Sequence, residues 1–285
     1  MGLIPQETWA TFKKLLVTIT KVIYALSIMI TSAGCLLVLY FGLRIFMFDS
    51  YPVNTGSMTP TIQPGDRVVV NKLIFGARLY RNLDFLNGGE LQTLRMKGYR
   101  GVNYNDLVVF NRSYPLAFDI RTVYVKRCIG LPGDTIWIQN GKYQNSSVQD
   151  RVVTKYFTRN ILTHLPDSLL TCYPYKEALN WTIQNLGPFY MPRKGDCIAL
   201  DQTNIWLYRR LMTYEHGADI RFEPDTVFLH NLPIQTYTFK ENYYFMAGEN
   251  FGNSADSRYF GPIPETFIVG VVPFKITARR RWERL

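Results

Sequence analysis

The longest hydrophobic segment of the chain lies near its N-terminus. Residues 22–43 run without a charged side chain. In an α-helix, at about 1.5 Å per residue, such a run spans the roughly 30 Å hydrocarbon core of a bilayer. A cleavable secretory signal has a shorter apolar stretch, of about 7–15 residues, that ends at a small-residue site. The small residues 31–34 are followed by further apolar positions, so we expect a transmembrane anchor over residues 22–48 rather than a cleaved leader.

The charges beside this segment suggest its orientation. Lys13, Lys14 and Lys21 precede it, whereas Arg44 and then Asp49 follow it. Lysine and arginine are enriched on the cytoplasmic side of membrane helices. We therefore expect residues 1–21 in the cytoplasm and everything after about residue 48 across the membrane.

Beyond Tyr51 the hydrophobic pattern changes to short apolar runs between turn residues. Four such runs, rich in Val, Ile, Tyr and Phe, are RVVVNKLIF, DLVVF, TVYVKRCIGL and DTIWIQ. Gly, Pro, Asn and Asp separate these runs. These are strand and turn signals. A Gly-Asp turn is joined to an apolar strand in three places, PGDRVVV, PGDTIWI and KGDCIAL. Helical periodicity is weak throughout. The pattern predicts a mainly β fold built on an antiparallel sheet.

The hydrophobic pattern is less regular in the middle of this region. Between residues 140 and 240 the chain contains turn-rich stretches such as NGKYQNSSVQD and polar-aromatic stretches such as LDQTNIWLYRR. We interpret residues 140–240 as an inserted β-rich lobe. The main β domain then comprises residues 49–139 and 241–285.

Composition narrows the functional classes. The 32 basic and 22 acidic residues give a net charge of +10, which suits an anionic partner. With an apolar anchor present, that partner is expected to be membrane lipid and not nucleic acid. The basic, Trp-containing tail over residues 278–285 is interpreted in the same way, as solvated or facing lipid headgroups.

Cysteine and histidine offer little for metal chemistry. The four cysteines are far apart, without the close pairs of a zinc or redox site. A disulfide between Cys172 and Cys197 stays open. The three histidines lie in no HExxH frame, so a Ser-His-Asp triad or a zinc hydrolase has few candidates. No metal and no cofactor are expected, and any nucleophile needs another base.

Three polar segments contain residues that could carry chemistry. Residues 54–61 place Ser57 between Gly56 and Met58, residues 124–134 place Lys126 in an apolar strand, and residues 248–258 form a loop of small and polar residues. Singly, each has an ordinary interpretation as a turn serine, a strand lysine or a solvated loop. In strand alternation Lys126 shares a face with Tyr124 and Cys128, so the pattern leaves its burial open.

Together these segments resemble the conserved boxes of type I signal peptidases, membrane proteases that remove leader peptides from exported proteins. The resemblance is carried by GSMTPT, NDLVVF, YVKRCIGLPGD and GENFGNSADSR, in the family's order and behind an N-terminal anchor. It covers the anchor and residues 51–138 and 243–275. Two positions depart from the family pattern: Asn105 stands where glycine is usual and Glu249 where aspartate is usual, which affects local turn geometry.

The resemblance implies a Ser-Lys protease. Ser57 is the implied nucleophile and Lys126 its general base. A lysine in water has a pKa of about 10.4, so Lys126 can act as a base only if burial, without a carboxylate partner, lowers its pKa. The backbone N–H of Ser57 and the hydroxyl of Thr55 are the implied oxyanion donors, and Ser254 is the implied orienting hydroxyl. An ion pair between Asp256 and Arg258 is expected to hold the Ser254 segment.

The resemblance also implies how substrate binds. Relatives bind substrate as an added strand, with shallow apolar pockets for small side chains. In this chain the matching positions are Val53, Asn54 and Thr55, together with Thr122 to Tyr124. Met58 is expected to reach the membrane or the substrate, with simple loop packing as the alternative.

The implied partners are signal peptides of exported preproteins, cleaved after Ala-x-Ala sites, membrane lipid, and the translocation machinery by proximity. The implied location is the inner (plasma) membrane, as a single-pass protein with its catalytic domain on the periplasmic face. Three alternatives are a processing peptidase for one exported substrate, an organellar inner-membrane peptidase, and a membrane-tethered β-rich scaffold whose boxes have decayed.

Overall fold

The computed structural model describes residues 6–82, 91–112, 119–148, 170–224 and 226–285, and the chain divides into two compact units, Met1–Met47 and Phe48–Leu285. The first unit is one helix, α1 (Gln6–Phe46). Its segment Thr11–Phe46 is long and apolar enough to cross a membrane. The hydroxyls of Thr18 and Thr20 donate to carbonyls four residues earlier in the helix, which satisfies polar groups within an apolar segment.

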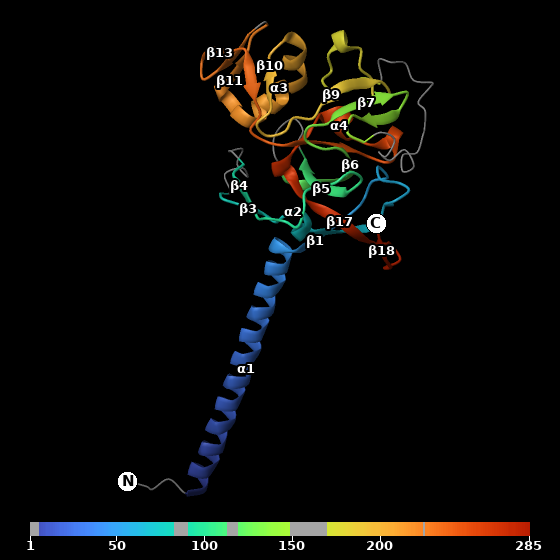
Figure 1. Ribbon diagram of the computed structural model, residues 1–285. Helices are drawn as coiled ribbons and strands as arrows, with labels where there is room; N and C mark the ends of the chain where they lie inside the picture. The colour runs from blue at the N-terminus through green and yellow to red at the C-terminus, as the bar shows by residue number, and fades with distance from the viewer. Residues whose placement is uncertain (1–5, 83–90, 113–118, 149–169, 225) are drawn as a thin grey trace. The chain divides into compact units, whose positions relative to one another are not determined.

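The second unit is built on an antiparallel sheet, as the alternating apolar runs predict (Figure 1). Its strands in spatial order are β1 (Phe48–Pro52), β2 (Arg67–Asn71), β17 (Ile268–Ile276), β5 (Leu107–Arg112), β6 (Asp119–Gly130), β15 (Tyr243–Ala247) and β16 (Ile263–Pro264), and β18 (Trp282–Arg284) pairs with β17. The sheet therefore joins strands from both ends of the predicted main domain.

Smaller sheets surround it. They are β3 (Arg78–Tyr80) with β4 (Thr93–Arg95); β8 (Lys142–Asn145), β7 (Thr135–Gln139) and β9 (Leu186–Tyr190); β10 (Cys197–Ala199) with β14 (Thr236–Thr238); and β11 (Ile220–Phe222), β12 (Val227–Leu229) and β13 (Leu232–Ile234). Short helical turns are α2 (Lys72–Phe75), η3 (Glu177–Leu179), η4 (Gly217–Asp219), η5 (Phe251–Asn253), α4 (Ser257–Phe260) and η6 (Glu265–Phe267).

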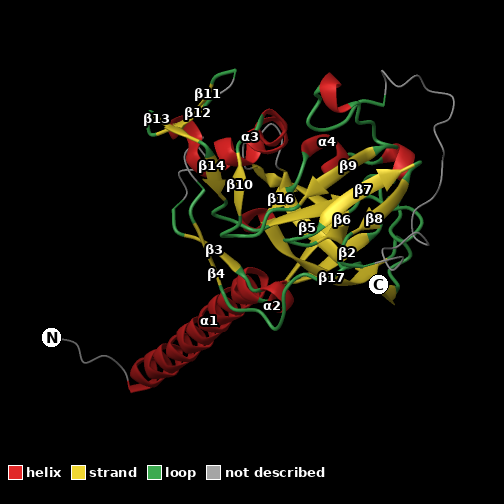
Figure 2. Cartoon of the chain, turned by 45° about the horizontal axis from the view of Figure 1, so that its top comes forward, coloured by secondary structure: helices red, strands yellow, loops and turns green. Residues whose placement is uncertain are grey.

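The described part of the region 140–240 contains one α-helix beside its strands. α3 (Gln202–His216) occupies a stretch interpreted as part of a β-rich lobe, and it lies beside β10 and the β11–β13 sheet (Figure 2). Asp201 caps its first turn by accepting from the Asn204 N–H at 2.7 Å. Ile205, Tyr208 and Met212 recur at helical spacing and are buried. The expectation of weak helical periodicity was therefore wrong for Gln202–His216.

The inserted residues share a core with the main sheet. One buried cluster joins Ile129 and Phe245 of the sheet to Phe189 and Met212 of the region 140–240. A second cluster, which contains Val53, Met58 and Val109, lies under the loop after β1. The cysteines are all free, with Cys172 buried and Cys197 exposed, so the disulfide left open by the sequence is not formed.

Candidate active site

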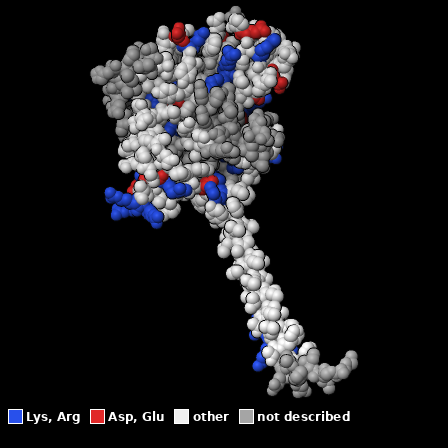
Figure 3. Space-filling model, turned by 180° about the vertical axis from the view of Figure 1, so that it is seen from behind, with Lys and Arg blue, Asp and Glu red and all other residues white. Residues whose placement is uncertain are grey.

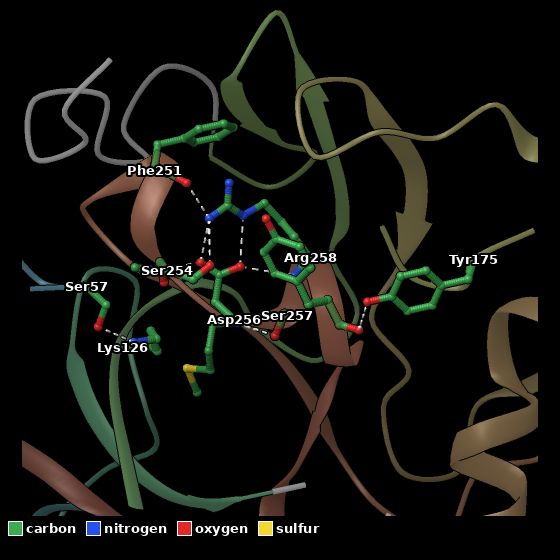
Figure 4. A network of polar contacts seen from close by, with 11 residues as sticks. Ser57, Lys126, Tyr175, Phe251, Ser254, Asp256, Ser257 and Arg258 are labelled. Carbon is green, nitrogen blue, oxygen red and sulfur yellow. Dashed lines mark hydrogen bonds and ion pairs between the residues drawn. The ribbon is translucent and has the colours of Figure 1, made fainter. Parts of the chain in front are cut away.

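Ser57 and Lys126 meet inside the second unit. Ser57 lies in the loop between β1 and β2, and Lys126 lies in β6 opposite Val108 of β5. Lys126 Nζ donates to Ser57 Oγ at 2.6 Å (Figure 4). Only 2% of Lys126 and 7% of Ser57 is exposed. Residues 69 positions apart in sequence thus form a buried hydroxyl–amine contact.

The burial of Lys126 follows from its strand. β6 packs apolar side chains on both faces: Tyr124 and Cys128 contact one buried cluster, while Val123 and Val125 contact another. Lys126 on this strand is 2% exposed, and the centre of the Tyr124 ring lies 5.8 Å from Lys126 Nζ. Lys126 is therefore buried, a point that strand alternation left open.

The charge state of Lys126 is set mainly by that burial. Desolvation lowers the pKa of Lys126 to about 8, with Asp256 raising it and Arg258 lowering it by smaller amounts. Among the described residues no carboxylate forms an ion pair with this ammonium. With such a pKa, roughly a tenth of the lysine is neutral at pH 7 and about half at pH 8.

The two expected oxyanion donors lie on the Ser57 side of the contact. Thr55 Oγ1 is 3.5 Å from Ser57 Oγ. Within the described part of the chain, the Ser57 N–H donates no hydrogen bond, while the Ser57 carbonyl accepts from Asn250 N–H at 3.0 Å. Both donors are therefore on the nucleophile loop, beside the oxygen that would attack.

Ser254 is buried close to the pair, on the segment after η5 (Figure 4). Its Oγ has no hydrogen-bond partner in the described structure, and no bond to Lys126 is formed. A Cβ on Gly248 would lie 2.0 Å from this Oγ, so only glycine fits beside the hydroxyl. The orienting role of Ser254 stays a prediction.

Asp256 and Arg258 form the expected ion pair. Both side chains are fully buried, and Arg258 Nε and Nη2 donate to the two Asp256 oxygens at 2.9 Å each. Asp256 also accepts from Gly248 N–H at 2.9 Å. Burial alone would raise the pKa of Asp256, but the Arg258 guanidinium and these hydrogen bonds hold that pKa below its ordinary value.

Arg258 extends the same network. Its Nη2 donates to the Phe251 carbonyl at 2.9 Å and to the Ser254 carbonyl at 3.4 Å. The network therefore ties the backbone on both sides of Ser254 to one buried ion pair, as Figure 4 shows.

A pocket of about 430 Å³ opens beside Ser57 and Lys126. The predicted substrate positions Val53, Asn54 and Thr55, together with Thr122 to Tyr124, all lie in its wall. The apolar wall side chains include Val53, Val68, Val109, Val123 and Val125. β15 pairs with β6 only over residues 127–130. On the described strands, residues 123–126 of β6 therefore have a ladder partner on one side, β5, and an open edge on the other.

Met58 is placed elsewhere. Its side chain is 0% exposed and packs in the cluster with Ile62, Val68 and Val269, and it does not line the pocket. The loop turns this side chain inward because a fully apolar residue is stabilised there by burial. Loop packing, the alternative interpretation, therefore describes Met58, and the expected contact with membrane or substrate is corrected.

Arg127 contacts both residues that depart from the family pattern, Asn105 and Glu249. Arg127 Nε donates to Glu249 Oε1 at 2.8 Å, and Arg127 Nη1 donates to the Asn105 carbonyl at 2.6 Å. Asn105 has a φ of 72°, a left-handed conformation that asparagine tolerates better than most residues. Both substitutions are thus accommodated next to Lys126 without altering the Ser57 contact.

The sequence interpretation missed Asn250. Its N–H donates to the Ser57 carbonyl, and its Nδ2 donates to the Gly56 carbonyl at 3.1 Å. Asn250 thereby fixes the nucleophile loop from the 248–258 segment. The only sequence signal was its place in that segment, because a pairing between residues 57 and 250 leaves no local pattern.

Comparison with known proteins identifies the family of the chain. The family model described as "Signal peptidase, peptidase S26" matches residues 26–277. Signal peptidase I of Pseudomonas aeruginosa is 28% identical over 234 residues, which cover 81% of this chain and 62% of that protein. Signal peptidase I of Buchnera aphidicola (subsp. Baizongia pistaciae) is 26% identical over 84% of this chain and 73% of its own.

A shorter match links the chain to a second bacterial group. Signal peptidase I P of Bacillus subtilis subsp. natto is 36% identical over 104 residues, 36% of this chain and 42% of its own. The chain spans less than two thirds of the length of the Pseudomonas protein. Because the family model covers most of the chain, including every residue of the Ser57–Lys126 site, this protein belongs to the signal peptidase family, peptidase S26.

Proposed function

We propose that this chain is a membrane-bound endopeptidase that removes N-terminal signal peptides from exported preproteins, cutting after Ala-x-Ala sites. Ser57 is the nucleophile and Lys126 the general base. Family membership supports the reaction, and one observation carries the mechanism: the 2.6 Å contact between Ser57 Oγ and a buried lysine that has no ion-pair partner among the described residues. A scaffold with decayed boxes would have no reason to keep this contact.

The chemistry starts with neutral Lys126. Its amine takes the proton from Ser57 Oγ as that oxygen attacks the scissile carbonyl carbon. The negative charge that develops on the carbonyl oxygen is stabilised by the Ser57 N–H and the Thr55 hydroxyl, an interaction of the kind that contributes about 10²–10³-fold per donor. The Lys126 ammonium then protonates the leaving amine, and the acyl group stays on Ser57.

Deacylation reuses the same groups. Neutral Lys126 removes a proton from a water molecule, the hydroxide attacks the ester carbon, and the proton returns to Ser57 Oγ as the carboxylate leaves. One lysine therefore serves in turn as base and acid. The buried Asp256–Arg258 pair supports the reaction by holding the Ser254 segment beside Lys126.

This pocket is the proposed binding site for the small side chains that precede the cleaved bond. A peptide added as a strand along the open edge of β6, near residues 123–126, would present alternate side chains to the same face. The side chains at the first and third positions before the cleaved bond would then both enter the valine-lined pocket. This periodicity of two accounts for a rule of the form Ala-x-Ala, in which the middle residue is free.

Membrane lipid is a further proposed partner, and α1 is the proposed single-pass anchor, with a cytoplasmic N-terminus and a periplasmic second unit. In the second unit, the hairpin of β17 and β18 exposes 65% of Trp282 and 40% of Phe274. Exposed Arg279, Arg280 and Arg281 form its turn, and Figure 3 shows Lys and Arg side chains gathered on one projecting part of the body. Aromatic rings beside arginines suit anionic headgroups. The translocation machinery is proposed as a partner by proximity alone.

Cleavage of a defined precursor tests the proposed function. The purified full chain in detergent is expected to cut a precursor once, directly after Ala-x-Ala. Phenylalanine at the last position before the bond is expected to lower kcat/KM by at least about 100-fold, because the proposed rule admits only small side chains at that position. Mass spectrometry of the products identifies the bond. Absence of cleavage, or equal cleavage of the phenylalanine precursor, would contradict the proposal.

A further inference from the structure

The pocket beside Ser57 has a third wall. Most of its lining residues belong to the segment 51–57 and to β6, but Asn253 and Ala255 also line it. These two residues lie on either side of Ser254 in the sequence, and both are exposed, whereas Ser254 is buried. The segment therefore presents Asn253 and Ala255 to the pocket and Ser254 to the protein interior.

The backbone around Asn253 is held by buried groups. Arg258 Nη2 donates to the Phe251 carbonyl before it and to the Ser254 carbonyl after it (Figure 4). The Asn253 N–H donates to the Asn250 carbonyl at 3.0 Å, and Asn250 in turn donates to the nucleophile loop. Asn253 is therefore an exposed residue on a fixed support. A binding group on such a support loses little conformational freedom when a ligand binds.

The side chain of Asn253 lies next to the nucleophile loop. A Cβ built on Gly56 would be 4.0 Å from Asn253 Nδ2. Within the described part of the chain, the Asn253 side-chain amide makes no hydrogen bond. An asparagine amide has two donor hydrogens and an acceptor oxygen, so it matches both polar groups of a peptide unit. Asn253 therefore offers a donor and an acceptor at the rim of the pocket.

The proposed mechanism indicates which part of the substrate passes Asn253. Lys126 protonates the leaving amine, so the first nitrogen after the cleaved bond must lie against Lys126 Nζ. The peptide before the bond occupies the valine-lined part of the pocket. Ser254 is close to the nucleophile, because a Cβ on Gly248 would lie 2.0 Å from Ser254 Oγ and 2.8 Å from the Ser57 carbonyl oxygen. The peptide after the bond therefore leaves past the remaining wall, the segment 253–255.

We propose that Asn253 is a substrate-binding residue that recognises the backbone after the cleaved bond. Its amide donates to the carbonyl oxygen of the peptide unit between the first and second residues after the bond, and it accepts from the N–H of the same unit. The proposal rests on the proposed function, which supplies the direction in which the substrate crosses the site. Preproteins differ in the side chains that follow the bond, whereas this peptide unit recurs in all of them unless the second residue is proline.

The test combines one change in the enzyme with one in the substrate. Asn253→Ala is expected to lower kcat/KM for an Ala-x-Ala precursor about tenfold, mainly through KM, because it removes binding that does not depend on the reacting bond. Replacing the peptide unit between the first and second residues after the bond by an ester removes its N–H. This ester should lower kcat/KM about tenfold for the unmodified chain. If the two groups pair, the ester should lower kcat/KM of Asn253→Ala by about twofold or less.

Gln235→Ala is the matched control. It removes an exposed amide between β13 and β14, outside the pocket, and should keep both the precursor rate and the full effect of the ester. Asn253→Ala should keep the thermal midpoint of the unmodified chain. An unchanged precursor rate in Asn253→Ala, or an ester effect equal to that in the unmodified chain, would overturn the role of Asn253. Failure of the unmodified chain to cut the all-peptide precursor would instead overturn the proposed function.

Discussion

Substituting Ser57 by alanine or Lys126 by methionine is expected to lower kcat for precursor cleavage by about 10⁵-fold. Ser57→Ala removes the attacking oxygen, and Lys126→Met removes the amine that lies 2.6 Å from that oxygen and takes its proton. Because the two residues act as one unit, the double variant is expected to be no less active than either single one. Single-turnover cleavage of a labelled precursor measures all three rates.

Lys126→Arg is the matched control for charge. Arginine keeps a cation but does not deprotonate in proteins, so this variant is expected to be as inactive as Lys126→Met. Methionine fills nearly the same volume without a buried ammonium, so the thermal midpoint of Lys126→Met should equal or exceed that of the unmodified chain. A stable, well-folded Lys126→Met protein with more than about 1% of the original activity would exclude Lys126 as the base.

The second large effect is on stability. Asp256→Asn is expected to lower the free energy of unfolding by about 3–5 kcal/mol, because it leaves the fully buried Arg258 guanidinium without its counter-charge. Asparagine retains the shape and one acceptor oxygen, so the loss reports charge and not volume. Denaturant titration of the detergent-solubilised chain, followed by tryptophan fluorescence, measures the change.

Glu223→Gln provides the comparison. Glu223 pairs with Arg221 at 3.5 Å, with about half of each side chain or more exposed, so its loss should change the free energy of unfolding by less than about 1 kcal/mol. Asp256→Asn also removes a charge that raises the pKa of Lys126, so the pH dependence of any residual activity should move to lower pH. Equal effects of the two substitutions on stability would show that the Asp256–Arg258 pair is not a structural support.

The sequence was informative where motifs are contiguous. The strand–turn pattern predicted an antiparallel, mainly β unit, and the boxes around Ser57 and Lys126 pointed to two residues that the fold brings together. The Asp256–Arg258 ion pair was also predicted, because both partners lie in one short loop. The limits of residues 140–240 as a lobe stay a prediction, since their side chains share a core with the main sheet.

Other features depend on packing between distant segments. Strand alternation could not decide the burial of Lys126, because both faces of β6 are covered by apolar clusters. Met58 looked like a contact residue beside the nucleophile, yet the loop turns it into the core. α3 was not predicted, because its residues were interpreted as part of a β-rich lobe. Its apolar positions recur at spacings of three and four residues, which is typical of a helix.

The pH dependence of kcat/KM shows whether buried Lys126 is the base, because this parameter reports ionisation of the free enzyme. The substrate should carry no group that titrates between pH 6 and 10. If buried Lys126 is the base, kcat/KM rises about tenfold per pH unit and levels off above a pKa of about 8, as the neutral amine becomes dominant. A flat profile, or a rise that continues to the pKa of about 10.4 expected for a solvated lysine, would contradict the account.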